Sequence, residues 1–110
     1  NFGYNPEAGD YGNVLITEHE ISGSKIWALY GHLDSKSLIG KSKGQSVTKG
    51  QTIGHFGNES ENGGWEPHLH FQLSIIEPET HDLPGVVSIQ DSAIALKLYP
   101  DPRLVLGPIY

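Results

Sequence analysis

Two histidines near the middle of the chain, His68 and His70, are separated by a single residue. They alternate with apolar side chains in the stretch that runs to Leu73, and this period is typical of a strand with one buried and one accessible face. We therefore expect both imidazoles side by side on the accessible face. Two neighbouring imidazoles can bind one metal ion together, or one can be a ligand while the other transfers protons. The alternative is a strand that carries two exposed histidines by chance.

A third histidine, His32, follows the β-rich run 25–30 at the point where that strand should end. Loops that begin where a strand ends often carry catalytic groups. Together with His68 and His70 it would form a cluster of three imidazoles from two strands. Because imidazole titrates near neutral pH, such a cluster can bind a metal ion or move the proton of an attacking water, as zinc peptidases require.

The composition bounds what kind of protein this is. At 110 residues the chain should form one domain, residues 1–110, with a single modest core. Its 14 Gly and 7 Pro predict many short elements joined by turns, with more β than α structure. The net charge of −6 argues against a nucleic-acid partner, because no surplus of Lys and Arg is available to displace counterions. No apolar run is long enough to span a membrane, and without cysteine neither a disulfide nor a cysteine zinc site can form.

The elements that must position the histidines are predicted to be mostly strands. Two β-rich runs, residues 14–19 and 25–30, are joined by a Gly/Ser turn and predict a β-hairpin. The segment around Phe2 should be the end of a further strand. A single helical turn should follow the hairpin, with Asp34 or Ser35 as its N-cap.

The remaining segments are predicted to be short and rich in turns. Residues 44–57 should form two short β-rich pieces with a tight turn at Lys49–Gly50. Residues 77–110 should be an extension that packs on the domain, with a short helix over 91–98 and Asp91 as its N-cap, although the period there also fits a strand. An extended tail should follow, with apolar anchors at Leu104, Leu106 and Ile109.

Three motifs carry a resemblance to a known family. They are Tyr30-Gly31-His32-Leu33, the run 44–54, and Pro67-His68-Leu69-His70-Phe71, preceded by a strand that starts near Asp10. In order and spacing, residues 10–75 resemble the lysostaphin-type zinc metallopeptidases, the glycyl-glycine endopeptidase family. The resemblance implies a mainly β fold, an antiparallel β-sandwich or barrel of the duplicated hybrid motif type with one or two short helical segments. It also implies cleavage of a peptide or amide bond, usually in bacterial cell-wall peptidoglycan.

The resemblance assigns a role to each histidine of the cluster. His70 would be a ligand of Zn²⁺. His68 and His32 would be the catalytic pair that holds or deprotonates the attacking water and stabilises the oxyanion. The remaining histidines are expected to take no part in the chemistry: His19, His55 and His81.

The chain departs from the family in one respect. The family supplies two further zinc ligands, spaced His-x-x-x-Asp, upstream of the strand that starts near Val14. No histidine precedes His19, and the only aspartate there, Asp10, belongs to another motif. The chain alone should therefore bind zinc weakly or not at all and be inactive. Because it begins abruptly at Asn1, we expect an N-terminal truncation that removed the ligands; a degenerate parent is the alternative.

The stretches around the histidine pair suggest a narrower match. Residues 62–67, 83–86 and 99–102 look like the peptidase-like domain of large fusion proteins, between a kinase-like phosphotransferase domain and a class III aminotransferase domain. That match implies neighbouring domains in a longer chain and a cytoplasmic location. A cell-wall hydrolase would instead be extracellular or periplasmic.

Functions from three classes remain open. The first is a zinc peptidase acting on a peptide or amide substrate. The second is a non-catalytic β-module that links or regulates neighbouring enzymes, because the turn motif in residues 47–54 also resembles lipoyl- and biotinyl-type domains. The third is a domain that binds small amino-bearing metabolites. Missing strands would also leave an unpaired sheet edge through which the chain could form a homodimer.

Overall fold

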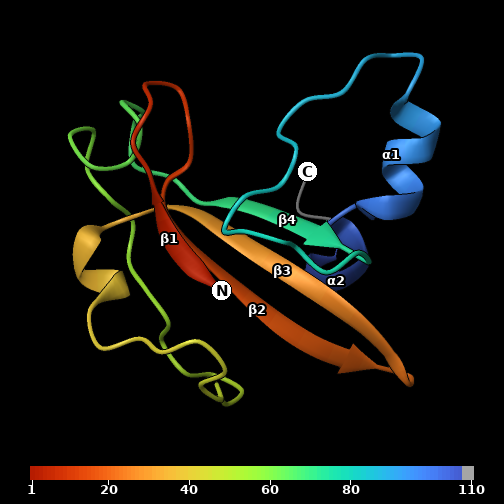
Figure 1. The fold of residues 1–110 in the computed structure, drawn as a ribbon, viewed down its shortest axis with the longest axis horizontal. Coiled ribbons are helices and arrows are strands. Elements are labelled where there is room, and N and C mark those ends of the chain that lie inside the picture. Colours follow the sequence, from red (N-terminus) through yellow and green to blue (C-terminus); the bar gives the residue numbers. More distant parts are fainter. Residues whose placement is uncertain (108–110) are drawn as a thin grey trace.

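The computed structural model describes residues 1–107, and its centre is one antiparallel sheet with strand order β1-β2-β3-β4 (Figure 1). Every neighbouring pair in the sheet is antiparallel. The predicted mainly β, antiparallel class is confirmed. The strands are β1 (Phe2–Asn5), β2 (Gly12–Ile21), β3 (Ser24–Leu33) and β4 (His70–Ser74).

The β2–β3 hairpin dominates the sheet. Its turn residues Ser22 and Gly23 have φ of 51° and 78°, as a two-residue type I′ turn requires. The predicted hairpin is confirmed, but each strand is ten residues long and extends past the apolar runs. Pairing continues through these polar ends to Ile21 and Ser24, and a diagonal cross-strand ion pair of 2.9 Å joins Glu18 to Lys25 there.

The core lies on one face of the hairpin, in the half that is farther from its turn. Val14 and Leu29 are fully buried, and Ile16 and Tyr11 pack with them. Leu83, from the segment after β4, closes the cluster. The half of the hairpin next to its turn is exposed, so the packing is concentrated at the end of the sheet where the histidines lie.

β4 is shorter than the predicted strand. It begins at His70, so His68 lies before the strand rather than beside His70 on its accessible face, and Leu69 is 40% exposed. The last ladder pair is Gly31 with His70. β4 cannot continue alongside β3 beyond this pair because the backbone of His32 is already used, its N–H by Tyr11 and its carbonyl by Gly57.

Residues 44–57 do not form the two short β pieces that the sequence predicts. The structure places only an isolated bridge there, between Leu33 and Phe56. The tight turn at Lys49–Gly50 does form, with Gly50 at φ 80° and a hydrogen bond from Gln51 N to Thr48 O of 3.0 Å. Among the described residues this segment pairs with a strand through that single bridge to β3 and forms no ladder, so its β propensity is not realised.

The helical segments are short. The predicted single turn is a 3₁₀ helix, η1 (Ser35–Leu38), and the carboxylate of Asp34 accepts from Ser37 N at 2.8 Å. The predicted helix is α1 (Ser92–Leu98), with Asp91 at its N-cap but without a side-chain capping bond. None of the helices in residues 1–107 has the length or apolar character needed to cross a membrane.

The predicted extended tail is wrong in part. Residues Arg103–Leu106 form a helical turn, α2, which starts after Pro102 at a φ of −56° that suits a first helical turn. Leu104 is 79% exposed and is not a buried anchor. The third predicted anchor, Ile109, lies outside the described residues.

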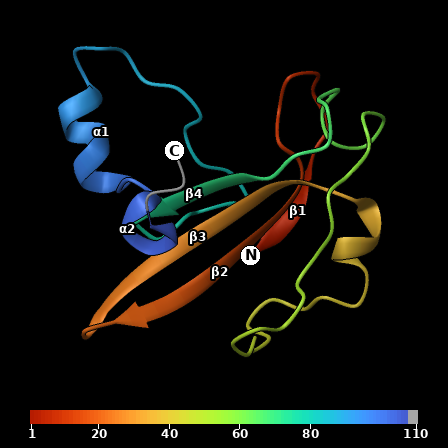
Figure 2. The ribbon, with the colours of Figure 1, turned by 180° about the vertical axis from the view of Figure 1, so that it is seen from behind.

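The loops and the C-terminal helices lie on opposite sides of the sheet's long hairpin. Figures 1 and 2 agree that residues 39–69 run along one side while α1 and α2 lie on the other. The C-terminal segment is tied to the sheet by Ile75 N, which donates to Leu98 O at 2.9 Å, and by the hydroxyl of Tyr11, which donates to Leu83 O at 3.1 Å.

Candidate active site

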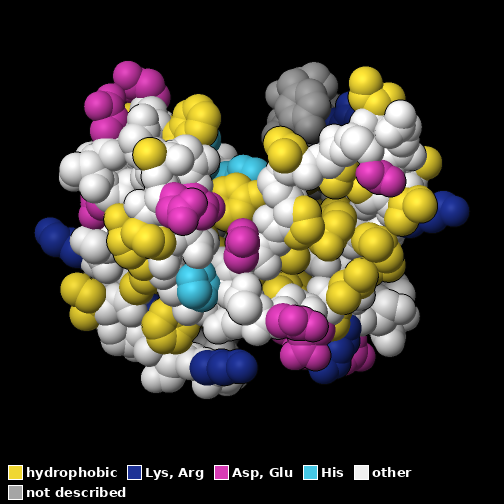
Figure 3. Space-filling model, turned by 45° about the horizontal axis from the view of Figure 1, so that its top comes forward, with side chains coloured by type: hydrophobic (Ala, Val, Ile, Leu, Met, Phe, Trp, Pro, Cys, Tyr) yellow, Lys and Arg dark blue, Asp and Glu magenta, His cyan; other side chains and the backbone are white. Residues whose placement is uncertain are grey.

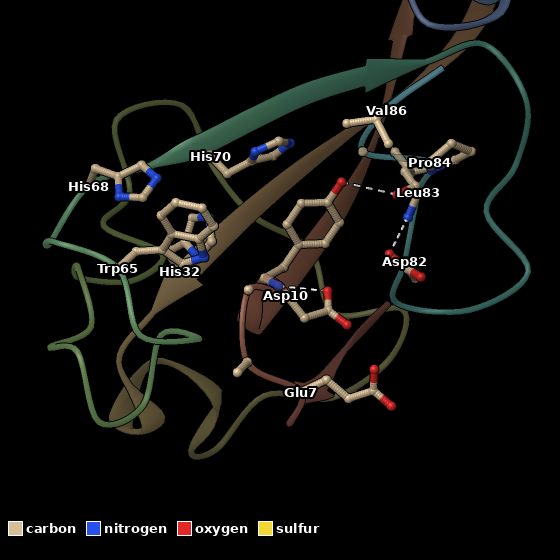
Figure 4. Close-up of a pocket in the computed structure, with 14 residues that line it drawn as sticks. Glu7, Asp10, His32, Trp65, His68, His70, Asp82, Leu83, Pro84 and Val86 are labelled. Atoms are coloured by element: carbon tan, nitrogen blue, oxygen red, sulfur yellow. Dashed lines mark hydrogen bonds between the residues drawn. The ribbon is translucent and has the colours of Figure 1, made fainter. Parts of the chain in front are cut away.

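A cleft of about 600 Å³ lies where β3 ends and β4 begins (Figure 4). The three predicted histidines line it together with Trp65, and the segments 7–11 and 82–86 form the facing wall. In the space-filling view of Figure 3, histidine lies in the hollow between the two halves of this face. The structure therefore brings His32, His68 and His70 into one cleft, whereas His19 and His55 lie elsewhere.

His32 is held rigidly at the end of β3. Its φ of 62° is unusual for a residue with a side chain, and it is maintained by backbone bonds from His32 N to Tyr11 O (2.7 Å) and from Gly57 N to His32 O (2.8 Å). Its ring Nδ1 lies 2.7 Å from the carbonyl oxygen of Asn62. Because that oxygen can only accept, Nδ1 carries the proton and Nε2 keeps a lone pair.

The pKa of His32 is lowered from its ordinary value. Burial is the main cause, since only 4% of the residue is exposed, and the nearby imidazoles of His68 and His70 lower it further. The bond to the Asn62 carbonyl opposes this shift. His32 is thus neutral near pH 7 and able to accept a proton.

Asn62 organises the loop that carries Trp65 and leads to His68. It is fully buried, and its amide donates to Gly57 O (3.1 Å) and Trp65 O (2.7 Å). Its side-chain oxygen accepts from Gly64 N (3.2 Å) and Trp65 N (2.9 Å). Asn62 was not among the predicted site residues, although an asparagine followed by two glycines is a signal for a tight turn.

His68 lies opposite His32 at the exposed mouth of the cleft. The two ring centroids are 4.4 Å apart with a tilt of 40°. The His68 Nδ1 lies 2.6 Å from the carbonyl oxygen of Glu66, so this nitrogen also carries the proton and Nε2 is free. The two imidazoles therefore share one arrangement, with Nδ1–H fixed on a backbone carbonyl and Nε2 able to accept a proton.

His70 is held by two side chains. The ring of Tyr11 packs against it with centroids 4.5 Å apart, and Gln72 Oε1 lies 3.2 Å from its Nε2. Burial raises the pKa of Tyr11 to about 12, with help from the carboxylates of Asp82 and Asp10, so its hydroxyl stays protonated. Tyr11 and Gln72 were also missed, although Gln72 shares the strand face of His70 in a period-2 pattern.

The facing wall of the cleft is acidic. Glu7, Asp10 and Asp82 line it, as Figure 4 shows. Asp10 and Asp82 each accept a hydrogen bond from the backbone N–H of the following residue, at 2.6 Å and 2.8 Å. Imidazoles on one side and carboxylates on the other give the cleft two distinct surfaces.

The cleft does not by itself make a complete metal site. Among the described residues, no group of three His, Cys, Asp or Glu side chains is arranged to hold a metal ion. A catalytic zinc site needs three protein ligands, and the resemblance described above predicts one of them, His70.

Comparison with known proteins places residues 3–82 within a family described as Peptidase family M23. A Haemophilus influenzae protein named an uncharacterized metalloprotease is 37% identical over 91 residues, covering 79% of this chain and 18% of that protein. The peptidoglycan DD-endopeptidase ShyA of Vibrio cholerae is 41% identical over 64 residues, 58% of this chain and 13% of ShyA. The chain thus spans less than a fifth of the length of either relative. No solved structure matches the chain significantly.

Proposed function

The chain belongs to peptidase family M23, and from this premise we propose that its cleft hydrolyses a peptide or amide bond with His32 and His68 as the catalytic residues. The observation that carries the proposal is the paired arrangement of these imidazoles. Their centroids lie 4.4 Å apart, and each Nδ1 is bound to a backbone carbonyl. Both Nε2 atoms are thereby left as proton acceptors inside one cleft.

The two histidines differ in their surroundings, and this suggests different catalytic roles for them. The lowered pKa of the buried His32 keeps it neutral, so its Nε2 accepts the proton of the attacking water. His68 lies at the exposed mouth, where a substrate carbonyl enters. Once protonated, an imidazole there can donate to the developing oxyanion or to the leaving amine.

The family implies a metal, generally zinc, which supplies Lewis-acid polarisation and a more acidic water when bound. His70 is the residue of this chain that we assign as a ligand. Because residues 1–107 contain no group of three ligands, we propose that the others come from sequence outside residues 1–110. On its own the chain should bind zinc weakly and be inactive.

A relative named a peptidoglycan DD-endopeptidase supports a cell-wall peptide cross-link as the substrate. This substrate would require a location outside the cytoplasm. The competing proposal, a domain of a cytoplasmic fusion protein, predicts aminotransferase and phosphotransferase domains in the same polypeptide. The printed names of the two relatives refer to neither activity.

The test uses the full polypeptide that carries this chain. We expect one zinc per chain by metal analysis and hydrolysis of cross-linked peptidoglycan fragments that a chelator abolishes. His32→Gln and His68→Gln should each lower kcat by about 100-fold or more, the usual worth of a general acid or base. His55→Gln, an exposed histidine outside the cleft, is the matched control. A zinc-loaded polypeptide without hydrolysis would favour the non-catalytic module, and hydrolysis that is unaffected in both variants would refute the roles assigned to His32 and His68.

A further inference from the structure

Gln72 connects His70 to the facing wall of the cleft. It lies two residues after His70 on β4, which places both side chains on the same face of the strand. Its Oε1 lies 3.2 Å from His70 Nε2, and its Nε2 lies 3.0 Å from the carbonyl oxygen of Pro84. The amide therefore bridges His70 and the segment of Pro84, which Figure 4 shows on different sides of the cleft.

The donors and acceptors of this bridge can be assigned in only one way. The Pro84 carbonyl can only accept, so the amide must turn its NH₂ end toward it. The amide oxygen is then the atom that faces His70, and this oxygen can also only accept. His70 must therefore donate from Nε2, which leaves Nδ1 as its unprotonated nitrogen.

This tautomer is the opposite of that of the other two imidazoles. His32 and His68 carry the proton on Nδ1, fixed by the carbonyls of Asn62 and Glu66. His70 instead carries it on Nε2, fixed by a side chain. The cluster thus contains two backbone-set tautomers and one that a single residue, Gln72, can set.

A second contact fastens the same segment. Tyr11, whose ring packs on His70, donates its hydroxyl proton to Leu83 O at 3.1 Å. The carbonyls of two successive residues, Leu83 and Pro84, thus bind the two side chains that touch His70. A side chain added at Gly85 would collide with the Tyr11 hydroxyl, so this wall also packs tightly against the tyrosine.

We propose that Gln72 is a positioning residue that fixes His70 in the Nε2–H tautomer, with the Pro84 carbonyl as its anchor. The importance of this tautomer for hydrolysis rests on the proposed function, whereas the tautomer itself follows from the hydrogen bonds alone. The Nδ1 lone pair of His70 is then available whenever this hydrogen bond is made. Second-sphere partners of this kind orient an imidazole and select its tautomer.

Long-range ¹H–¹⁵N correlation spectra of the ¹⁵N-labelled chain test the proposal. They are recorded about two units above the ordinary imidazole pKa, where the rings are neutral. We expect His70 of the wild type to show the Nε2–H pattern and His32 the Nδ1–H pattern. In Gln72→Leu, the ratio of Nε2–H to Nδ1–H forms at His70 should fall about five-fold, the worth of one hydrogen bond.

Two further variants keep the result interpretable. Gln72→Glu retains an acceptor for His70 but cannot donate to Pro84, so the Nε2–H tautomer should persist. Gln90→Leu, an exposed glutamine outside the cleft, should leave the spectrum of His70 unchanged. An Nδ1–H tautomer at His70 in the wild type, or an unchanged ratio in Gln72→Leu, would overturn the proposal. Because no step of this test measures hydrolysis, an inactive peptidase would refute the proposed function and leave the tautomer standing.

Discussion

Replacing Asn62 by alanine should destabilise the fold more than any other single truncation in the loop 57–65. The side chain is fully buried and makes four hydrogen bonds to backbone groups of that loop. At about 0.5–1.5 kcal/mol for each bond, the sum is roughly 2–6 kcal/mol. Water can reach part of the opened loop, so we expect a loss of about 3 kcal/mol in the free energy of unfolding.

Urea unfolding of the 110-residue chain measures this loss, and the slope of the transition should stay unchanged. Asn58→Ala is the matched control because Asn58 lies in the same loop and is exposed, and its side-chain oxygen accepts from Ser60 N and Ser60 Oγ. Its cost should stay below about 1 kcal/mol. Equal costs for the two variants, or less than about 1 kcal/mol for Asn62→Ala, would refute the reasoning.

Two further perturbations follow from the same loops and from the helical turn η1. Gly63→Ala should cost clearly more than Gly64→Ala in thermal unfolding, because both have φ near 90° but only the first added Cβ would collide with a backbone oxygen. Hydrogen bonding from Ser37 lowers the pKa of Asp34, so its capping contribution is present above the unfolded pKa and is lost as pH falls through the folded one. Unfolding free energies measured between about pH 5 and pH 2 should therefore fall more steeply in the wild type than in Asp34→Asn, and parallel curves would contradict this capping role.

Short sequence patterns predicted the elements whose structure depends mainly on residues close together in the chain. The hairpin follows from two β-rich runs around Ser22–Gly23, and the helical turn follows from the capping residue Asp34. The cluster of His32, His68 and His70 was also predicted, through motif order and strand ends. Each of these depends on residues close together in sequence or on a pattern shared with a family.

The errors arose where distant backbone decides the outcome. The start of β4 at His70 depends on Tyr11 and Gly57 binding the backbone of His32, and neither contact leaves a trace in the alternation of residues 68–73. Among the described residues the β-rich run 44–57 pairs with β3 through the Leu33–Phe56 bridge alone, and β propensity by itself does not supply a ladder.

The residues that hold the histidines were missed for the same reason. Tyr11 and its acceptor Leu83 are 72 positions apart, and Gln72 and Pro84 are 12 apart. Asn62 fixes His32 through its backbone carbonyl, which any residue type possesses. The sequence shows only the side chains that hold these backbone carbonyls in place.

The chemical state of the cluster depends on loops as well as on the sheet. Loop carbonyls of Asn62 and Glu66 hold the rings of His32 and His68, and Gln72 of β4, the partner of His70, is itself bound to the carbonyl of Pro84 in the segment after β4. Since loops open at a lower free energy than central strands, the pattern of protons on the imidazoles should be lost before the sheet unfolds. Loop stability, more than sheet stability, should thus determine whether the Nε2 atoms of His32 and His68, the proposed catalytic pair, and the Nδ1 atom of His70 are presented together.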